Sequence, residues 1–116
     1  MKLTIIQLST FVANWRRLKL NDDDLRALEA VFLEDASRGP MMSGTGGLRK
    51  LRFAPPSWRT GKSGATRVAY AYFQDYQAVF LIVIYSKNEK DNLSHEQRNQ
   101  MKLLLDRIKQ SLSKGR

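Results

Sequence analysis

Basic side chains and one tyrosine recur at strand-like spacing in the middle and later parts of this chain. In a six-residue run of alternating apolar and basic residues, Lys50 and Arg52 face the same way. Arg67 begins a second such run, and Tyr85 and Lys87 lie two residues apart at the end of a third. Cations neutralise the charge that builds on phosphorane oxygens, and a lysine or tyrosine near a hydroxyl can move a proton. These residue types therefore suit chemistry on a bent phosphodiester.

A β-meander is the arrangement that would bring these side chains together. In a meander, the second strand starts near the end of the first, and the third ends near the start of the second. Arg52, Arg67 and the Tyr85/Lys87 pair then converge at one end of the sheet. Because the loop over 54–65 is long, it constrains the register between the strands at 48–53 and 66–73 only weakly.

The distribution of charge points to the same region. The chain has 116 residues and a formal net charge of +9, and residues 36–74 contain seven Lys or Arg but no Asp or Glu. A solubilising surface usually interleaves both signs. An acid-free block of this length favours a polyanionic partner, which is nucleic acid, an anionic membrane surface or an acidic protein.

Composition narrows the class of protein. The chain has no cysteine and one histidine, which excludes disulfides and thiolate zinc sites and argues against a histidine metal cage or a Ser-His-Asp triad. No apolar run is long enough to span a bilayer. The first eight residues lack the length and cleavage site of a signal peptide and are predicted to form a strand. We expect one domain over residues 1–116, located in the cytoplasm.

Periodicity predicts an α+β fold in which an N-terminal strand and two helices are followed by an antiparallel sheet and a C-terminal helix. The expected strands cover 2–8, 48–53, 66–73 and 77–85, the last one apolar enough to be central and buried on both faces. The first helix is capped by Ser9 or Thr10, and the second begins at Asn21 or Asp22 and is stopped by Arg38-Gly39-Pro40. Ser94 and Gln97 form a capping box at the start of the last helix.

Three short motifs follow one another along the chain: GGLRK, which begins at Gly46, RVAYAY, which begins at Arg67, and IYSKNEK, which begins at Ile84. In this order they resemble the RelE/ParE superfamily of toxins from bacterial toxin–antitoxin pairs, most closely its HigB/RelE-like branch. Each is weak alone, but the three are specific as a set. The resemblance covers about residues 44–95, and the helices on either side match only in layout.

The resemblance implies a small α+β endoribonuclease that enters the ribosomal A site and cleaves mRNA without a metal or cofactor. The messenger's 2′-hydroxyl attacks the adjacent phosphate and leaves a 2′,3′-cyclic phosphate. By this resemblance Lys50 or Arg52 acts as general base and neutralises charge, and Arg67 grips the phosphate. Lys87, or Lys90, stabilises charge on the leaving oxygen or protonates it. The expected RNA contacts are Arg49, Arg59, Lys62, Tyr85 and Lys90.

The chain departs from the family at one position. Some members carry a tyrosine near the start of the last helix, where this chain has Ser94 beside His95. Tyr85 and His95 are the alternatives that would supply this group. Tyr70 and Tyr72 either stack a nucleotide or pack beneath the N-terminal helices.

The resemblance also implies binding partners, and two alternative functions stay open. The partners are a cognate antitoxin, typically a helix-turn-helix DNA-binding protein in the HigB-like branch, and the 70S ribosome with its mRNA; no membrane is involved. One alternative is a non-catalytic ParE-like toxin that inhibits gyrase, against which the retained Lys50, Arg52, Arg67 and Lys87 argue. The other is a plain basic RNA- or ribosome-binding protein. For the residues themselves, the alternative is that Lys50 and Arg52 form the solvated face of an antiparallel sheet and that Arg67 pairs with Asp75 or Glu89.

Overall fold

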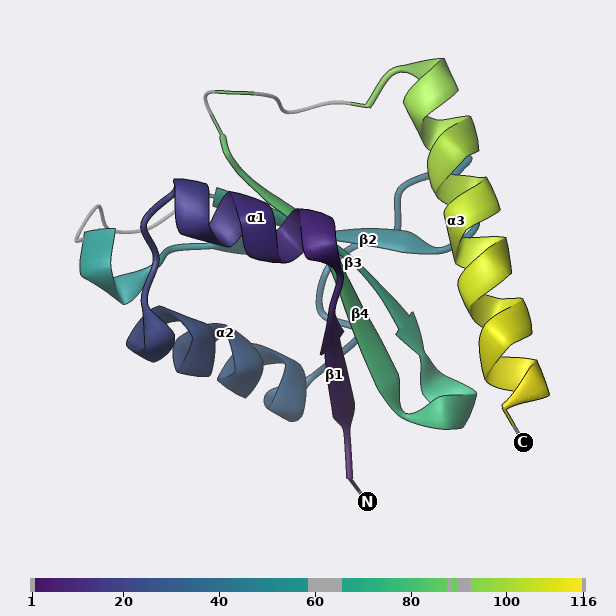
Figure 1. The fold of residues 1–116 in the computed structure, drawn as a ribbon, viewed down its shortest axis with the longest axis horizontal. Coiled ribbons are helices and arrows are strands. Elements are labelled where there is room, and N and C mark those ends of the chain that lie inside the picture. The colour runs from purple at the N-terminus through teal and green to yellow at the C-terminus, as the bar shows by residue number, and fades with distance from the viewer. Residues whose placement is uncertain (1, 59–65, 88, 90–92, 116) are drawn as a thin grey trace.

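A four-stranded sheet with helices on both faces forms the body of the protein, in a computed structural model that describes residues 2–58, 66–87, 89 and 93–115. The strands are β1 (Thr4–Gln7), β2 (Leu48–Phe53), β3 (Thr66–Phe73) and β4 (Ala78–Ser86). The helices are α1 (Ser9–Arg17), α2 (Asp22–Glu34) and α3 (His95–Lys114), with short 3-10 turns at Pro56–Trp58 and Gln74–Tyr76 (Figure 1). The predicted α+β class and order of elements are confirmed.

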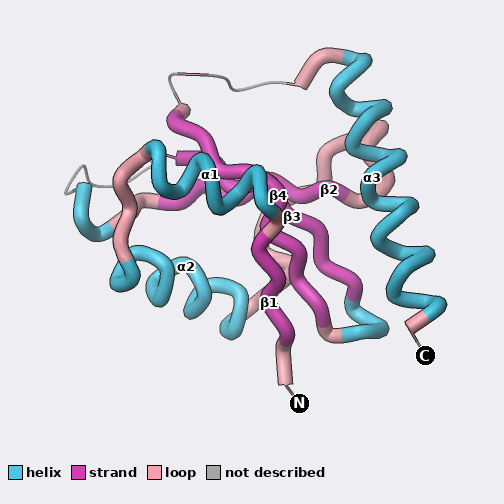
Figure 2. The backbone as a smooth tube through the Cα atoms, viewed as in Figure 1, coloured by secondary structure: helices cyan, strands magenta, loops and turns pink. Residues whose placement is uncertain are grey.

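The sheet has the strand order β1-β4-β3-β2 (Figure 2). Strands β2, β3 and β4 form the predicted antiparallel meander, and β4 is the predicted central strand. Its other neighbour is β1, which pairs with it in parallel, with Thr4 opposite Ala78. A register shift between Ala69 and Tyr70 leaves one β4 residue, Ile82, as the extra residue of a bulge.

Helices cover the two faces of the sheet unequally. The larger core joins α1 and α2 to one face and contains Phe11, Leu28, Phe32, Tyr70 and Ile84, each at most 1% exposed. On the other face, Leu105 of α3 packs with Leu48 and Ala71. Because Leu48 and Ala71 face each other at one end of the β2–β3 ladder, α3 covers that end of the face.

Two of the three predicted helix starts are confirmed by hydrogen bonds. Asn21 and Asp24 form a reciprocal capping box on α2, and Ser94 and Gln97 form one on α3. The prediction that Ser9 or Thr10 caps α1 is wrong, because the N-cap residue is Leu8 and no side chain makes a capping hydrogen bond there. The hydroxyl of Thr10 instead donates to the carbonyl of Ile82 on β4.

The segment that follows α2 runs along the outer edge of β2. Helix α2 ends at Glu34, before the predicted stop at Arg38-Gly39-Pro40. The backbone N–H of Lys50 donates to Pro40 (3.1 Å), and that of Met42 donates to Leu48 (2.8 Å). The chain therefore reverses between this segment and β2 through glycines with positive φ at 44, 46 and 47. Within the described part of the chain, no helix has the length and apolar composition needed to cross a membrane.

Candidate functional site

Three side chains form a row across one end of the sheet. Arg52 on β2 lies directly opposite Arg67 on β3, and Arg67 lies directly opposite Tyr85 on β4. Residues that oppose each other in adjacent strands project from the same face. The register therefore confirms that Arg52, Arg67 and Tyr85 converge, as the sequence predicts.

Lys50 adds a third cation to the same face, two residues from Arg52. Because Lys50 bonds outward to Pro40, Lys50 and Arg52 occupy non-hydrogen-bonded positions of the β2–β3 ladder. At such positions the two Cα atoms are about 4.5 Å apart and side chains approach most closely. Like charges directly opposite each other destabilise a sheet. The Arg52–Arg67 pair is thus a costly arrangement that an anion between the two guanidinium groups would relieve.

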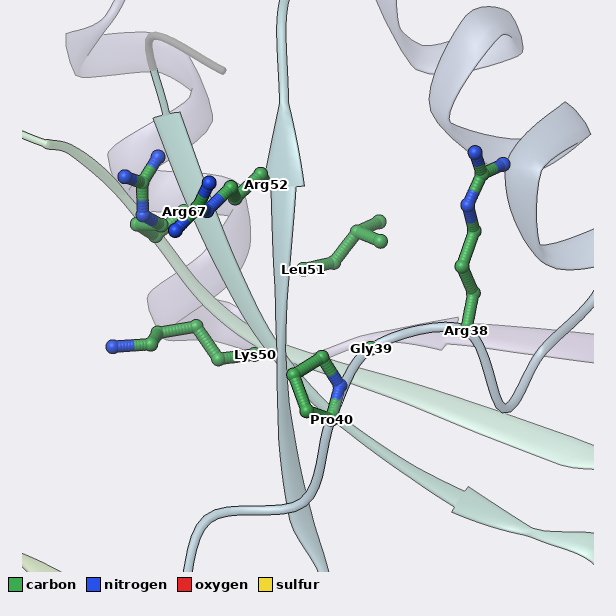
Figure 3. A pocket seen from close by; sticks show the side chains of 7 residues that line it. All are labelled: Arg38, Gly39, Pro40, Lys50, Leu51, Arg52 and Arg67. Atoms are coloured by element: carbon green, nitrogen blue, oxygen red, sulfur yellow. The ribbon is translucent and has the colours of Figure 1, made fainter. Parts of the chain in front are cut away.

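An open hollow of about 450 Å³ lies beside this cluster. Lys50, Arg52 and Arg67 line it and point to one side of β2, whereas Leu51 points to the other side, on which Arg38 also lies (Figure 3). Gly39 and Pro40, which run along the outer edge of β2, also line the hollow. Arg67 is buried (7% exposed), Lys50 is half-buried and Arg52 is exposed. The site cations therefore range from Arg67, which the protein encloses, to Arg52, which is open to solvent.

Tyr70 and Arg49 hold the Gly39–Pro40 edge from the opposite face of the sheet. The buried Tyr70 hydroxyl donates to the carbonyl of Ala36 (2.8 Å) and accepts the N–H of Gly39 (2.9 Å). Burial raises the pKa of Tyr70, although the bond from Gly39 lowers it in part. Arg49 donates from Nη1 to the carbonyls of Ser37 (2.9 Å) and Gly39 (2.8 Å). The prediction that Tyr70 stacks a nucleotide is therefore wrong, and its alternative place in the core is confirmed.

The turn that carries Lys87 is fixed to α1. Glu89 closes this turn by accepting the N–H of Ser86 (2.9 Å) and donating its own N–H to the Ser86 carbonyl (3.0 Å). Its carboxylate also pairs with Arg17 of α1 (2.9 Å). The hydrogen bonds from Arg17 and then from Ser86 lower the pKa of Glu89, so the carboxylate is ionised at neutral pH. Lys87 is exposed in this turn, directly after β4.

Asp24 anchors the segment that leaves β2. This fully buried carboxylate accepts the N–H of Ser57 (2.9 Å), the hydroxyl of Ser57 (2.6 Å) and the N–H of Asn21 (3.0 Å). Burial raises its pKa, but these three hydrogen bonds outweigh burial and lower it on balance. The N-terminus of α2 thus holds the Pro56–Trp58 turn that follows the site strand.

Not every predicted site residue joins the cluster. The structure brings together Lys50, Arg52, Arg67 and Tyr85, and leaves Lys87 in the adjoining turn. It places Arg49 on the opposite face, and His95 is exposed at the start of α3. The predictions on Arg59, Lys62 and Lys90 lie outside the described residues.

Sequence reasoning missed that Arg38, Gly39 and Pro40 line the hollow. The one available signal was that Arg38 is the first basic residue of the acid-free block over 36–74. Among the described residues, no three Asp, Glu or His side chains are grouped so as to hold a metal ion. The groups gathered at the site are guanidinium, ammonium and phenol, which can donate hydrogen bonds to an oxyanion.

No protein-family model matches the sequence. The structure is similar to that of an arginine-to-alanine double mutant of the E. coli toxin RelE in the free state, with a TM-score of 0.51 and 18% sequence identity. The match covers 78% of this chain and 88% of that one. The chain therefore has a RelE-like fold.

Proposed function

We propose that this chain is the toxin of a toxin–antitoxin pair and acts as a ribosome-dependent mRNA endonuclease. The observation that carries the proposal is the row Arg52–Arg67–Tyr85 with Lys50 beside it, on the end of the sheet face that α3 does not cover. The RelE-like fold and the RelE/ParE motifs support the same assignment. Membership of the HigB-like branch, and a helix-turn-helix antitoxin as partner, are the finer parts of this proposal.

The proposed reaction is an internal transesterification. The 2′-oxygen bonds to phosphorus, the bond from phosphorus to the 5′-oxygen breaks, and a 2′,3′-cyclic phosphate and a free 5′-hydroxyl result. The 2′-hydroxyl proton passes to a base, for which Lys50 is the candidate, and the departing 5′-oxygen gains a proton. Arg67, held within the sheet, orients the phosphate, and Arg52 neutralises charge as it develops. Lys87 serves the leaving oxygen.

The test is to map new 5′ ends of mRNA after tightly induced expression. The wild type should stop growth and produce ends within codons positioned at the A site. A Lys50→Gln/Arg52→Gln double variant should do neither, because it removes two of the four cations that line the hollow. An Arg107→Gln/Lys109→Gln variant removes two exposed cations of α3 and should behave as the wild type.

Three outcomes would contradict the proposal. Growth arrest with intact mRNA would favour the gyrase-inhibiting alternative, and binding to ribosomes without arrest would favour a basic binding protein. Cleavage that survives in the Lys50→Gln/Arg52→Gln variant would place the chemistry elsewhere. Thermal unfolding of all three proteins should show that both variants are folded.

A further inference from the structure

A second hollow, of about 490 Å³, lies between α1, β4 and the first turns of α3. Its surface is mostly apolar, with Ile82, Val83, Leu93 and Met101 among the lining residues. Tyr85 also lines it. Because Tyr85 is the β4 member of the row Arg52–Arg67–Tyr85, this hollow adjoins the cation cluster on the β4 side.

We propose that this α1–β4–α3 groove binds one unpaired RNA base next to the phosphate held by Arg52 and Arg67. The inference deepens the proposed function and rests on it for the identity of the substrate. Strands β2 and β4 are separated by two strand spacings, roughly 10 Å. One nucleotide can bridge such an interval, with its phosphate at the cations and its base beyond Tyr85.

The lining matches the chemistry of a base. A base has flat faces that favour apolar and aromatic contact, and an edge that carries both donors and acceptors. Val83 and Met101 supply the apolar surface and Tyr85 supplies an aromatic ring. Three side-chain amides, those of Asn14, Gln97 and Gln100, stand around this surface. An amide offers a donor and an acceptor together, which is the pattern that reads a base edge.

The three amides are not equivalent. The Gln97 side-chain oxygen accepts the N–H of Ser94 in the α3 capping box, at 2.9 Å. This bond fixes the orientation of the Gln97 amide, so that its NH₂ group is the part left to meet a ligand. Asn14 on α1 is half-buried and Gln100 on α3 is exposed, so they approach the groove from its two walls. Glu89, also in the lining, is engaged by Arg17 and Ser86.

The test measures binding of six-nucleotide 2′-O-methyl RNAs of each single base, which cannot be cleaved, to the full chain at low salt. We expect the wild type to prefer one base over the least favoured by about tenfold, the range given by good side-chain hydrogen bonding to a base edge. An Asn14→Leu/Gln100→Leu variant should lose most of that preference. An Asn99→Leu/Gln110→Leu variant carries the same types of substitution at exposed α3 positions outside the groove and should keep it.

A second readout reports on the groove directly. Ring currents from a bound base should shift the methyl NMR signals of Val83 and Met101 and leave those of Leu33, which is exposed on α2, unchanged. A flat base preference, a preference that survives in the Asn14→Leu/Gln100→Leu variant, or unmoved Val83 and Met101 signals would each overturn the inference and leave the groove to a protein segment. Cleavage on ribosomes with no base preference would overturn this inference alone. Base-selective binding without cleavage would overturn only the proposed reaction.

Discussion

Arg52 and Arg67 lie directly opposite each other on β2 and β3, at a position of the ladder where cross-strand side chains come closest. Sheets normally avoid opposing like charges, and this pair carries an electrostatic cost in the folded state. Lys50 increases the positive potential on the same face. The arrangement is therefore suited to an anion more than to the stability of the sheet.

Removing one member of the pair should stabilise the protein while abolishing the proposed mRNA cleavage. We expect Arg52→Gln to raise the free energy of unfolding by about 0.2–1 kcal/mol, the usual size of a cross-strand pair term. Urea unfolding at low salt measures this, and added salt should reduce the gain by screening.

Sulfate provides the complementary measurement. It should raise the melting temperature of the wild type more than that of Arg52→Gln, because an anion that binds only the folded state stabilises it. Arg107→Gln, at an exposed position of α3, is the matched control and should respond as the wild type does. Equal sulfate responses in wild type and Arg52→Gln would show that the pair does not bind an anion.

The packing of helix α3 against the sheet depends on one side chain, because Leu105 is the only buried residue among those described in this helix. Leu105 is 2% exposed, whereas Leu103, on the same helix, is 60% exposed. Leu105→Ala should therefore cost about 2–5 kcal/mol, because it opens a cavity against Leu48 and Ala71. Leu103→Ala should stay within about 0.5 kcal/mol of the wild type. Chemical unfolding compares the two, and equal losses would mean that α3 is not docked through Leu105.

The strands of the meander could be predicted from the sequence to within a residue or so. Strands β2 and β3 begin and end where the alternation predicts, because glycine and proline residues and the change of pattern mark their limits. The place of β1 could not be predicted. Its four residues pair in parallel with β4, some seventy positions away, and such a choice depends on which edge of the sheet is left open.

The site could be predicted in part for a related reason. Strand order in a meander brings Arg52, Arg67 and Tyr85 to one end of the sheet, but the long 54–65 loop does not fix which residues oppose each other, and that register came from the structure. Alternation along β2 places Arg49 on the face opposite Lys50, but nothing in the sequence shows that the carbonyls of Ser37 and Gly39 lie there as its hydrogen-bond acceptors. Those partners come from the segment after α2, whose course along β2 is a tertiary feature.

Gly39 occupies a position with no room for a side chain. A Cβ there would lie 3.0 Å from the Lys50 carbonyl oxygen and 3.0 Å from the Tyr70 ring and hydroxyl. Gly39→Ala should thus push the segment away from β2 and cost about 1–3 kcal/mol, as overpacking does. Because Gly39 lines the hollow at Lys50, the variant should also weaken the proposed mRNA cleavage. Gly115→Ala meets only ordinary contacts and is the control. A fully stable Gly39→Ala protein would contradict this close packing.

The buried carboxylate of Asp24 should make stability depend on acidity. Its pKa is lowered in the folded state, so the folded protein binds that proton less readily than the unfolded chain does. The stability that the Asp24 carboxylate contributes is fully present above the unfolded pKa of about 3.9 and is lost as pH falls from there through the folded pKa.

At neutral pH, Asp24→Asn should cost about 2 kcal/mol, because an amide NH₂ would face the donors of Ser57 and Asn21. Melting temperatures measured from neutral to acidic pH should converge for wild type and Asp24→Asn, whereas the exposed Asp23→Asn control should follow the wild type. Wild-type and Asp24→Asn curves that stay parallel through the acidic range would show that Asp24 is not the group responsible.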